Sequence, residues 1–188
     1  MDVYEAIVKR RSIRRFKMNK VSMDLLKKCV NAARLAPSAA NLQPLHYVIV
    51  TDNHLVTQIF SFIKWAGYLE WNPTVDEGPP AYILVLCDKR IITGEGTYDV
   101  GLAVENIVLT ALSEGLGTCI LAAFDHNKIR PLLNIPLEYD IKLLIAVGHP
   151  NEQSLVADMT NSIRYYRRGR ILHVPKKRLE EIVHIDTF

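Results

Sequence analysis

The chain has 188 residues, of which 49% are hydrophobic and 23% charged, and its net charge at pH 7 is only +3. This balance is that of an ordinary globular protein and excludes a disordered, collagen-like or coiled-coil chain, and the length fits a single domain over residues 1–188. The net charge is too small to indicate a nucleic-acid partner by itself.

The first half of the chain predicts mostly helices. We expect helices over residues 3–9, 22–35 and 55–63, and a strand over residues 46–51, which are β-branched and aromatic. Ser22 is a candidate cap for the second helix, and Pro37 ends it. The irregular stretch 67–80, which is rich in proline and glycine, predicts a loop or a lid.

The second half predicts a buried strand, a long buried helix and two further strands. Strands are expected over residues 81–88, 118–122 and 142–147, helices over residues 98–114 and 127–133, and a final helical turn or two over residues 176–183. Within the first of these strands the run 81–87 is continuously apolar, as in a strand covered on both faces. The helix over 98–114 is apolar nearly all round, which predicts burial in a core or in a subunit interface. Because the two element types alternate irregularly, we expect an α+β fold with a central, mostly antiparallel or mixed sheet flanked by helices.

No segment predicts membrane insertion, export or a disulfide framework. The longest apolar run has seven residues, 81–87, whereas a membrane-spanning helix needs about 20. The N-terminus lacks the apolar core of a signal peptide. The three cysteines lie far apart and include no CxxC pair, which argues against disulfides and a zinc site. We therefore expect a cytoplasmic protein with no metal and no membrane partner.

The basic segment, residues 10–16, reads Arg10-Arg11-Ser12-Ile13-Arg14-Arg15-Phe16. Guanidinium forks, a hydroxyl and backbone N–H groups are the donors that bind phosphate. In an extended segment the side chains at positions 10, 12 and 14 point one way, while Ile13 and Phe16 can anchor the segment to the core. The alternatives are a solvated basic turn and, with less support, a nucleic-acid contact.

The amide loop, residues 36–44, has the sequence APSAANLQP and lies between a predicted helix and a predicted strand. Its small side chains let another molecule approach the backbone. The amides of Asn41 and Gln43 both donate and accept hydrogen bonds, which suits the edge of a flavin or a nucleobase. The alternative is an ordinary polar turn.

Two glycines, Gly115 and Gly117, separate the long helix from the strand that follows. On their own they indicate a C-cap and a tight turn. The sequence contains no GxGxxG, Walker or HExxH motif, so it gives no sign of a dinucleotide fingerprint, a P-loop or a zinc protease site.

Taken in order, these segments resemble the nitroreductase family of FMN-dependent flavoproteins. The resemblance rests on RRSIRRF at 10–16, APSAANLQP at 36–44, YDVGLAVENIVLTALSEGLGTC at 98–119 and IAVGHP at 145–150. It spans nearly the whole chain. It implies a nitroreductase-like α+β fold, an intertwined homodimer with two sites at the interface, and FMN as the cofactor.

The resemblance also implies roles for individual residues. The FMN phosphate and ribityl chain would be held by Arg10, Arg11, Ser12 and Arg14. The same flavin would be approached from the other subunit by Pro37, Ser38, Ala39, Asn41 and Gln43. The isoalloxazine ring would meet the backbone of Leu121, Ala122 and Ala123. A C-terminal cation would add to the phosphate site, with Lys176 the best match and Arg164, Arg168 and Arg170 as alternatives.

Two features depart from the family pattern. Leu45 stands where the family often has tryptophan, which weakens inference about packing beside the ring. The tail over residues 162–177 is rich in arginine and can form a hairpin that caps the phosphate or contacts the partner subunit.

The implied activity is a ping-pong transfer of hydride from NAD(P)H, through the flavin, to an acceptor of the nitroaromatic, quinone or flavin type, with no catalytic side chain. Trp65, Tyr68 and Trp71 are spaced three apart, so on a helix they would share a face and could stack on a flat substrate. The alternative is core or interface packing. Dehalogenation, flavin fragmentation and flavin binding without catalysis are the competing functions.

Overall fold

The computed structural model describes residues 1–91 and 97–188, and its centre is a four-stranded sheet between two layers of helices. The strands are β1 Leu45–Val50, β2 Ala81–Asp88, β3 Gly117–Leu121 and β4 Tyr139–Gly148. Their order is β1-β2-β4-β3, and every neighbouring pair is antiparallel. The predicted α+β fold with a mostly antiparallel central sheet is confirmed.

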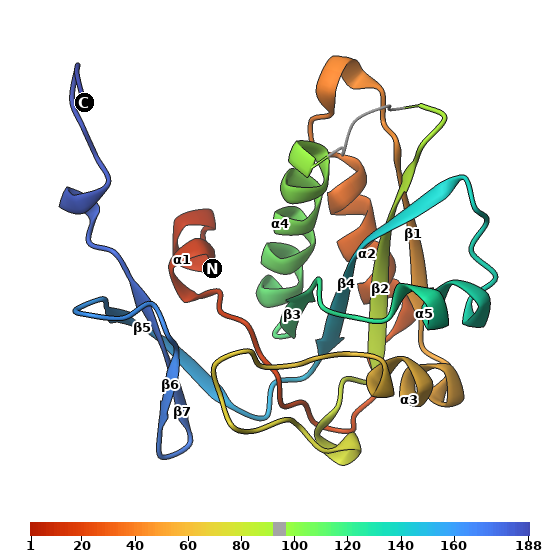
Figure 1. Ribbon diagram of the computed structural model, residues 1–188, viewed down its shortest axis with the longest axis horizontal. Coiled ribbons are helices and arrows are strands. Elements are labelled where there is room, and N and C mark those ends of the chain that lie inside the picture. Colours follow the sequence, from red (N-terminus) through yellow and green to blue (C-terminus); the bar gives the residue numbers. More distant parts are fainter. Residues whose placement is uncertain (92–96) are drawn as a thin grey trace.

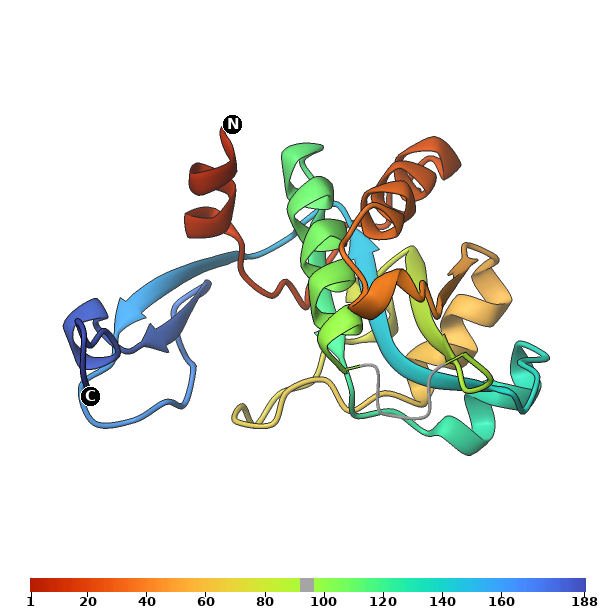
Figure 2. The same ribbon diagram turned by 90° about the horizontal axis from the view of Figure 1, so that it is seen from above.

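Helices cover both faces of this sheet (Figure 1). They are α1 Val3–Lys9, α2 Met23–Arg34, α3 Asn53–Ser61, α4 Thr97–Ser113 and α5 His126–Leu132. The helices α2 and α4 pack on one face, and α3 and α5 pack on the other. The side chain of Ser22 caps α2 by accepting the N–H of Leu25, as predicted. The short α1 lies between α4 and the C-terminal sheet in both Figure 1 and Figure 2.

The strand β2 is apolar from Ala81 to Cys87 because helices lie on both of its faces. Ile83 and Val85 pack in the cluster formed with α2 and α4. Tyr82 and Leu84 point the other way, into the cluster formed with α3 and α5. All residues of β2 are buried, so the prediction of a central buried strand is confirmed.

A second sheet, which we call the C-terminal sheet, follows β4 and extends away from the body of the protein (Figure 1). It consists of β5 Gln153–Asp158, β6 Tyr166–Arg168 and β7 Ile171–Lys176. The strand β7 pairs parallel with β5 and antiparallel with β6, so the predicted hairpin in the arginine-rich tail is confirmed. One turn of 3-10 helix, Leu179–Glu181, forms within the range where a final helical turn or two was expected. A single domain over residues 1–188 stays a prediction.

Two glycines let the basic segment cross the edge of the central sheet. Gly117 and Gly148 are paired in the β3–β4 ladder. A Cβ on Gly117 would lie 2.9 Å from Ile13 Cγ1, and a Cβ on Gly148 would lie 2.9 Å from Phe16 Cδ1 and 2.6 Å from Pro80 Cδ. Phe16 is fully buried, and Ile13 packs against the same core. The predicted anchoring of the basic segment by these two side chains is confirmed.

Gly148→Ala is expected to lower the free energy of unfolding by about 1–3 kcal/mol, because the added methyl group overpacks a filled site. Gly67→Ala is the matched control, since a Cβ there meets nothing within 4 Å, and it should change stability by less than about 0.5 kcal/mol. Urea denaturation compares the two variants. Equal midpoints would show that the basic segment can shift aside.

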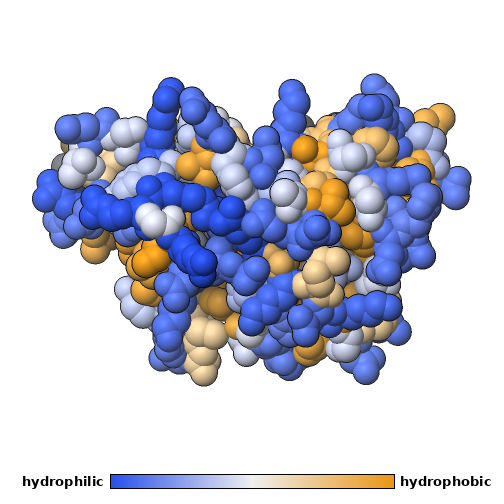
Figure 3. Space-filling view, turned by 90° about the horizontal axis from the view of Figure 1, so that it is seen from below, coloured by the Kyte–Doolittle hydropathy of each residue, from blue (hydrophilic) through white to orange (hydrophobic). Residues whose placement is uncertain are grey.

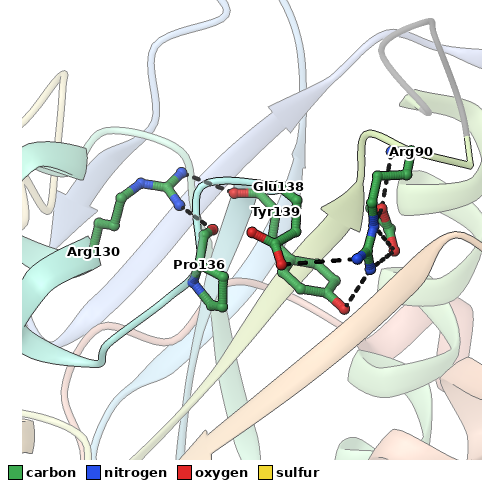
Figure 4. Close-up of polar contacts among 6 residues, drawn as sticks. Arg90, Arg130, Pro136, Glu138 and Tyr139 are labelled. Atoms are coloured by element: carbon green, nitrogen blue, oxygen red, sulfur yellow. Dashed lines mark hydrogen bonds and ion pairs between the residues drawn. The ribbon is translucent and has the colours of Figure 1, made fainter.

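Two arginines hold the turn that leads into β4 (Figure 4). Arg130 Nη1 donates to the carbonyl oxygen of Pro136 at 2.7 Å, and its Nη2 donates to the carbonyl oxygen of Tyr139 at 2.8 Å. Arg90 Nη2 donates to the phenolic oxygen of Tyr139 at 3.2 Å and to Asp88 Oδ2 at 2.6 Å. The Asp88 side chain is only 4% exposed, and its hydrogen bonds with Arg90 lower its pKa to about 2.

The lowered pKa of Asp88 predicts part of the response to acid. An unfolded aspartate titrates near pH ~3.9, so the interaction contributes fully above that pH and is lost as the pH falls toward about 2. We therefore expect Asp88→Asn to flatten the decline in unfolding free energy between about pH 4 and pH 2, as followed by urea denaturation. The exposed Glu180, changed to glutamine, is the control. An unchanged slope in Asp88→Asn would contradict the assignment.

Candidate functional site

The basic segment lies beside β3, the edge strand of the central sheet. Ser12 forms a parallel bridge with Thr118 of β3, and the N–H of Ile13 donates to the carbonyl oxygen of Thr118 at 2.8 Å. Phe16 forms an antiparallel bridge with Pro150, just beyond β4. These backbone contacts fix the segment before any ligand binds.

The first arginines of the segment present donors that fit an anion. Arg10 Nε lies 3.5 Å from Glu105 Oε1 on α4. Arg11 Nε is buried and has no hydrogen-bond partner among the described residues, although its Nη1 donates to the carbonyl oxygen of Arg10. Burial first, and then the charge of Arg10, lower the pKa of Arg11. A buried cationic donor that lacks an acceptor suits a phosphate group.

The later arginines of the segment contact aromatic side chains. Arg14 Nε donates to the carbonyl oxygen of Trp65 at 3.1 Å, and its guanidinium carbon lies 4.8 Å from the centre of the Tyr165 ring. The guanidinium carbon of Arg15 lies 4.4 Å from the centre of the Trp71 ring. These distances are typical of cation–π contacts. Within one chain, Arg14 is therefore held by the stretch after α3 and by Tyr165, which directly precedes β6.

Glu152 fixes the backbone of the basic segment, and sequence analysis missed it. Its Oε1 accepts the N–H groups of Arg14 at 2.5 Å and Arg15 at 3.2 Å, and its Oε2 accepts Arg167 Nη2 at 2.6 Å. The Glu152 side chain is 1% exposed. No motif marks this residue, because its partners lie far away in the sequence.

The amide loop is shaped by Asp99, a second residue that sequence analysis missed. Ser38 Oγ donates to Asp99 Oδ2 at 2.6 Å, and the N–H of Ala39 donates to Asp99 Oδ1 at 3.1 Å. The N–H of Gln43 in turn donates to Ser38 Oγ at 3.0 Å. Asp99 lies in the first turn of α4 and is buried. The Asp99 carboxylate therefore holds the amide loop in place through its hydrogen bonds with Ser38 and Ala39.

The loop backbone is strained. Ala40, Asn41 and Gln43 have φ angles of 48°, 54° and 52°, in the left-handed region that non-glycine residues rarely occupy. Such strain persists only where the surroundings enforce it, and it is concentrated at functional sites. Pro37, Ser38 and Gln43 also line a cavity of about 190 Å³ with residues of α2, β1 and α4.

A single chain does not bring the amide loop and the basic segment together. The loop is bonded to Asp99 at the start of α4, whereas Ser12 pairs with Thr118 beyond the end of that helix. Because α4 has 17 residues, its ends are about 25 Å apart. The amide loop and Ser12 therefore lie toward opposite ends of α4, while Arg10 contacts Glu105 in the middle of that helix.

The remaining predicted cofactor residues are divided between the central sheet and the C-terminal sheet. Leu121 is buried in the core, whereas Ala122 and Ala123 are exposed and line a cavity of about 620 Å³.

Lys176, the best match for the C-terminal cation, ends β7 and is exposed. Its alternatives, Arg164, Arg168 and Arg170, belong to the same tail, and hydrophilic side chains gather over that side of the molecule (Figure 3). The identity of the C-terminal cation stays a prediction.

Trp65, Tyr68 and Trp71 would share a face only on a helix, and no helix forms between α3 and the 3-10 turn at Val75–Glu77, in agreement with the loop predicted for residues 67–80. Each ring instead has its own partner. Trp65 is buried against Phe60, Tyr68 lies 5.1 Å from the ring of Tyr165, and Trp71 contacts two guanidinium groups. The second guanidinium belongs to Arg167, whose carbon lies 4.6 Å from the Trp71 ring centre. A role of these rings in substrate binding stays a prediction.

The part of the chain that the structure describes gives little support for a metal site, a membrane-spanning helix or a reactive thiol. Within it, no group of three or more His, Cys, Asp or Glu side chains could hold a metal ion. No helix in residues 1–91 and 97–188 is long and apolar enough to cross a membrane. All three cysteines are buried, and burial raises the pKa of Cys29 and of Cys119 to about 11, which keeps both thiols protonated at neutral pH.

Comparison with known proteins agrees with this geometry. A protein of Methanothermobacter thermautotrophicus, provisionally named NADH dehydrogenase/NAD(P)H nitroreductase, is 30% identical over 172 residues, or 88% of this chain and 86% of that protein. An iodotyrosine deiodinase of Thermotoga neapolitana is 28% identical over 169 residues, or 80% of this chain and 89% of that protein. The crystal structure of a provisionally named nitroreductase of Desulfovibrio desulfuricans in complex with FMN has a TM-score of 0.74 at 25% identity and covers 100% of this chain and 98% of that one. The sequence model of the Nitroreductase family matches residues 7–149, and this chain therefore belongs to that family.

Proposed function

We propose that this protein is an FMN-dependent oxidoreductase that takes electrons from NAD(P)H and delivers them to a small-molecule acceptor. Its cofactor is FMN, which supplies reversible hydride uptake when bound. The observation that carries the proposal is the basic segment, which is fixed beside β3 and includes the buried Arg11 Nε, for which residues 1–91 and 97–188 supply no hydrogen-bond partner. Family membership and the FMN complex of a relative support the same conclusion.

The chain supplies binding groups rather than a catalytic acid or base. Arg10, Arg11, Ser12 and Arg14 would hold the phosphate and ribityl chain through charge-assisted hydrogen bonds. The backbone N–H groups of Ala122 and Ala123 would stabilise negative charge as it develops on the reduced ring. The basic segment is positioned in advance, so little ordering accompanies binding.

A second copy of the chain would complete the site. Because the amide loop and Ser12 of the basic segment lie toward opposite ends of α4, the loop of one copy would meet the basic segment of the other. Exposed apolar side chains support an interface between copies: Val3 and Tyr4 of α1 are 73% and 77% exposed, and Tyr98 of α4 is 88% exposed. Large exposed apolar surface marks an interaction site. A homodimer follows from the proposal.

The acceptor has two candidate classes. The name of the archaeal relative includes a nitroreductase, which favours a nitroaromatic acceptor, and the named deiodinase relative favours reductive dehalogenation as the second candidate. Both use the same electron source and the same cofactor site. Turnover with matched nitro and halogenated aromatic compounds separates them.

The proposal is tested with the visible spectrum of the purified protein after addition of FMN. We expect flavin bands that bleach when NADH or NADPH is added without oxygen. Bands that persist would leave a flavin-binding protein without this activity, and the absence of flavin bands would contradict the proposal.

Arg14→Ala is expected to raise the Kd for FMN about tenfold or more, because it removes a charge-assisted contact to phosphate. Lys17→Ala is the matched control, since Lys17 is an exposed cation just beyond the same segment. Quenching of FMN fluorescence measures both affinities. Equal affinities in the two variants would remove Arg14 from the phosphate site.

A further inference from the structure

We infer that the cavity beside Ala122 and Ala123 is the acceptor site and that it selects planar aromatic acceptors carrying a negative charge. The inference rests on the proposed function, because that function places the flavin ring at these two alanines. The cavity has a volume of about 620 Å³ and is lined by residues 61–64, 122–126 and 128. This volume lies within the usual range for small-molecule sites.

The walls of the cavity are fixed by the backbone. The N–H of Lys64 donates to the carbonyl oxygen of Ala123, and the N–H of Asp125 donates to the carbonyl oxygen of Phe62, both at 2.9 Å. Ile63 and Phe124 form an antiparallel bridge between the same two stretches. The cavity is therefore formed before a ligand enters, which favours binding because few groups must be ordered.

Aromatic side chains supply flat surfaces. The rings of Phe124 and His126 are stacked, with centroids 4.2 Å apart and planes inclined by 30°. Phe62 lines another part of the cavity, where Lys128 Nζ lies 5.2 Å from its ring centre. Aromatic rings bind other flat rings by offset stacking or by edge contacts. A planar acceptor fits this lining.

The charge that remains available in the cavity is positive. Asp125 is the acidic residue of the lining, and its Oδ1 already accepts the N–H groups of Asn127 and Lys128, while its Oδ2 lies 3.7 Å from Lys128 Nζ. The Lys64 ammonium group has no hydrogen bond or ion pair with the described residues. An acceptor carrying a carboxylate would place its charge near Lys64.

The aromatic residues that line this cavity differ from the three that sequence spacing suggested for substrate binding. Trp65, Tyr68 and Trp71 do not line the cavity. A second cavity of about 620 Å³ contains Arg15 and Arg170, but it also contains Glu77 and Glu152 and does not reach Ala122. The cavity at Phe62, Lys64 and Phe124 therefore combines an aromatic lining with contact to the proposed flavin position.

The test compares 4-nitrobenzoate with 4-nitrobenzyl alcohol, which has the same ring and nitro group but no charge. Reduction of either to the nitroso compound and water takes two electrons and two protons. The hydride of NAD(P)H supplies both electrons and one proton, and the solvent supplies the other. We expect wild type to have the higher kcat/KM with 4-nitrobenzoate.

Lys64→Gln should lower the ratio of the two kcat/KM values about 3- to 5-fold, the effect of one partly exposed charge. Lys27→Gln, which removes an exposed lysine of α2, should leave that ratio unchanged. Benzoate, which cannot be reduced, gives a second readout: its Kd, measured by NMR titration without NAD(P)H, should rise by the same factor in Lys64→Gln only.

The outcomes separate the two proposals. If NAD(P)H bleaches the flavin but Lys64→Gln keeps the wild-type ratio and benzoate affinity, the inference is wrong and the proposed function stands. If the protein takes up no flavin, the proposed function is wrong. In that case, equal benzoate affinity in wild type and Lys64→Gln overturns the inference as well. Weaker benzoate binding in the variant instead supports an anion site at Lys64 that does not depend on flavin.

Discussion

Glu152→Ala is expected to lower the free energy of unfolding by about 3–5 kcal/mol, the usual cost of removing one partner from a buried ion pair. The Glu152 side chain is 1% exposed and that of Arg167 is 18% exposed. The carboxylate also accepts the backbone N–H groups of Arg14 and Arg15. The variant leaves these donors without an acceptor in a site that water reaches poorly. Urea denaturation measures the loss.

Glu181→Ala is the matched control for this prediction. Glu181 pairs with Arg178 at 3.4 Å, but the side chains are 36% and 67% exposed, so its removal should cost less than about 1 kcal/mol. The double variant Glu152→Leu with Arg167→Leu should lose less stability than Glu152→Ala, because no buried charge is left unpaired. An equal loss for Glu152→Ala and Glu181→Ala would contradict the buried contact.

Glu152 also links the basic segment to the C-terminal sheet. Arg167 contacts Glu152 with one nitrogen and lies against the Trp71 ring, which also contacts Arg15. We therefore expect any Glu152 variant that still folds to bind FMN more weakly, because the backbone at Arg14 is no longer held. Glu152 is in this sense a positioning residue.

The local elements could be predicted because their signals are local. The Ser22 cap lies three residues from the N–H that it accepts, and the apolar run of β2 requires no knowledge of its neighbours. Ile13 and Phe16 were identified as anchors because two apolar residues interrupt a cationic stretch. The close contacts of these two side chains with Gly117 and Gly148 could not be predicted, because Gly117 by itself indicates only a tight turn.

The contacts that shape the site could not be predicted, because they join distant parts of the chain. Ser38 and Asp99 are 61 positions apart, and Arg14 and Glu152 are 138 apart. A spacing of three between aromatic residues is compatible with a helix, but it does not indicate which side chains from other parts of the chain will contact them. Trp65 is buried in the core, which is the alternative that the sequence left open, and Trp71 contacts two arginines.

Asp99→Ala is expected to raise the Kd for FMN about 30-fold, which corresponds to about 2 kcal/mol. Ala40, Asn41 and Gln43 hold left-handed conformations that cost on the order of 1 kcal/mol or more each. The hydrogen bonds of Ser38 and Ala39 to Asp99 oppose that cost. Without them the loop relaxes, and FMN binding must restore its shape at the expense of affinity. FMN fluorescence titration measures the effect.

A second substitution distinguishes loop strain from general damage. Asp99→Ala combined with Ala40→Gly should recover part of the affinity, because glycine adopts the φ of 48° at position 40 without a steric penalty. Asp24→Ala, in the exposed first turn of α2, should leave the Kd unchanged. An unchanged Kd in Asp99→Ala would mean that the loop reaches its binding shape without this carboxylate. Recovery specific to position 40 would instead show that Asp99 acts on FMN through the backbone of the amide loop.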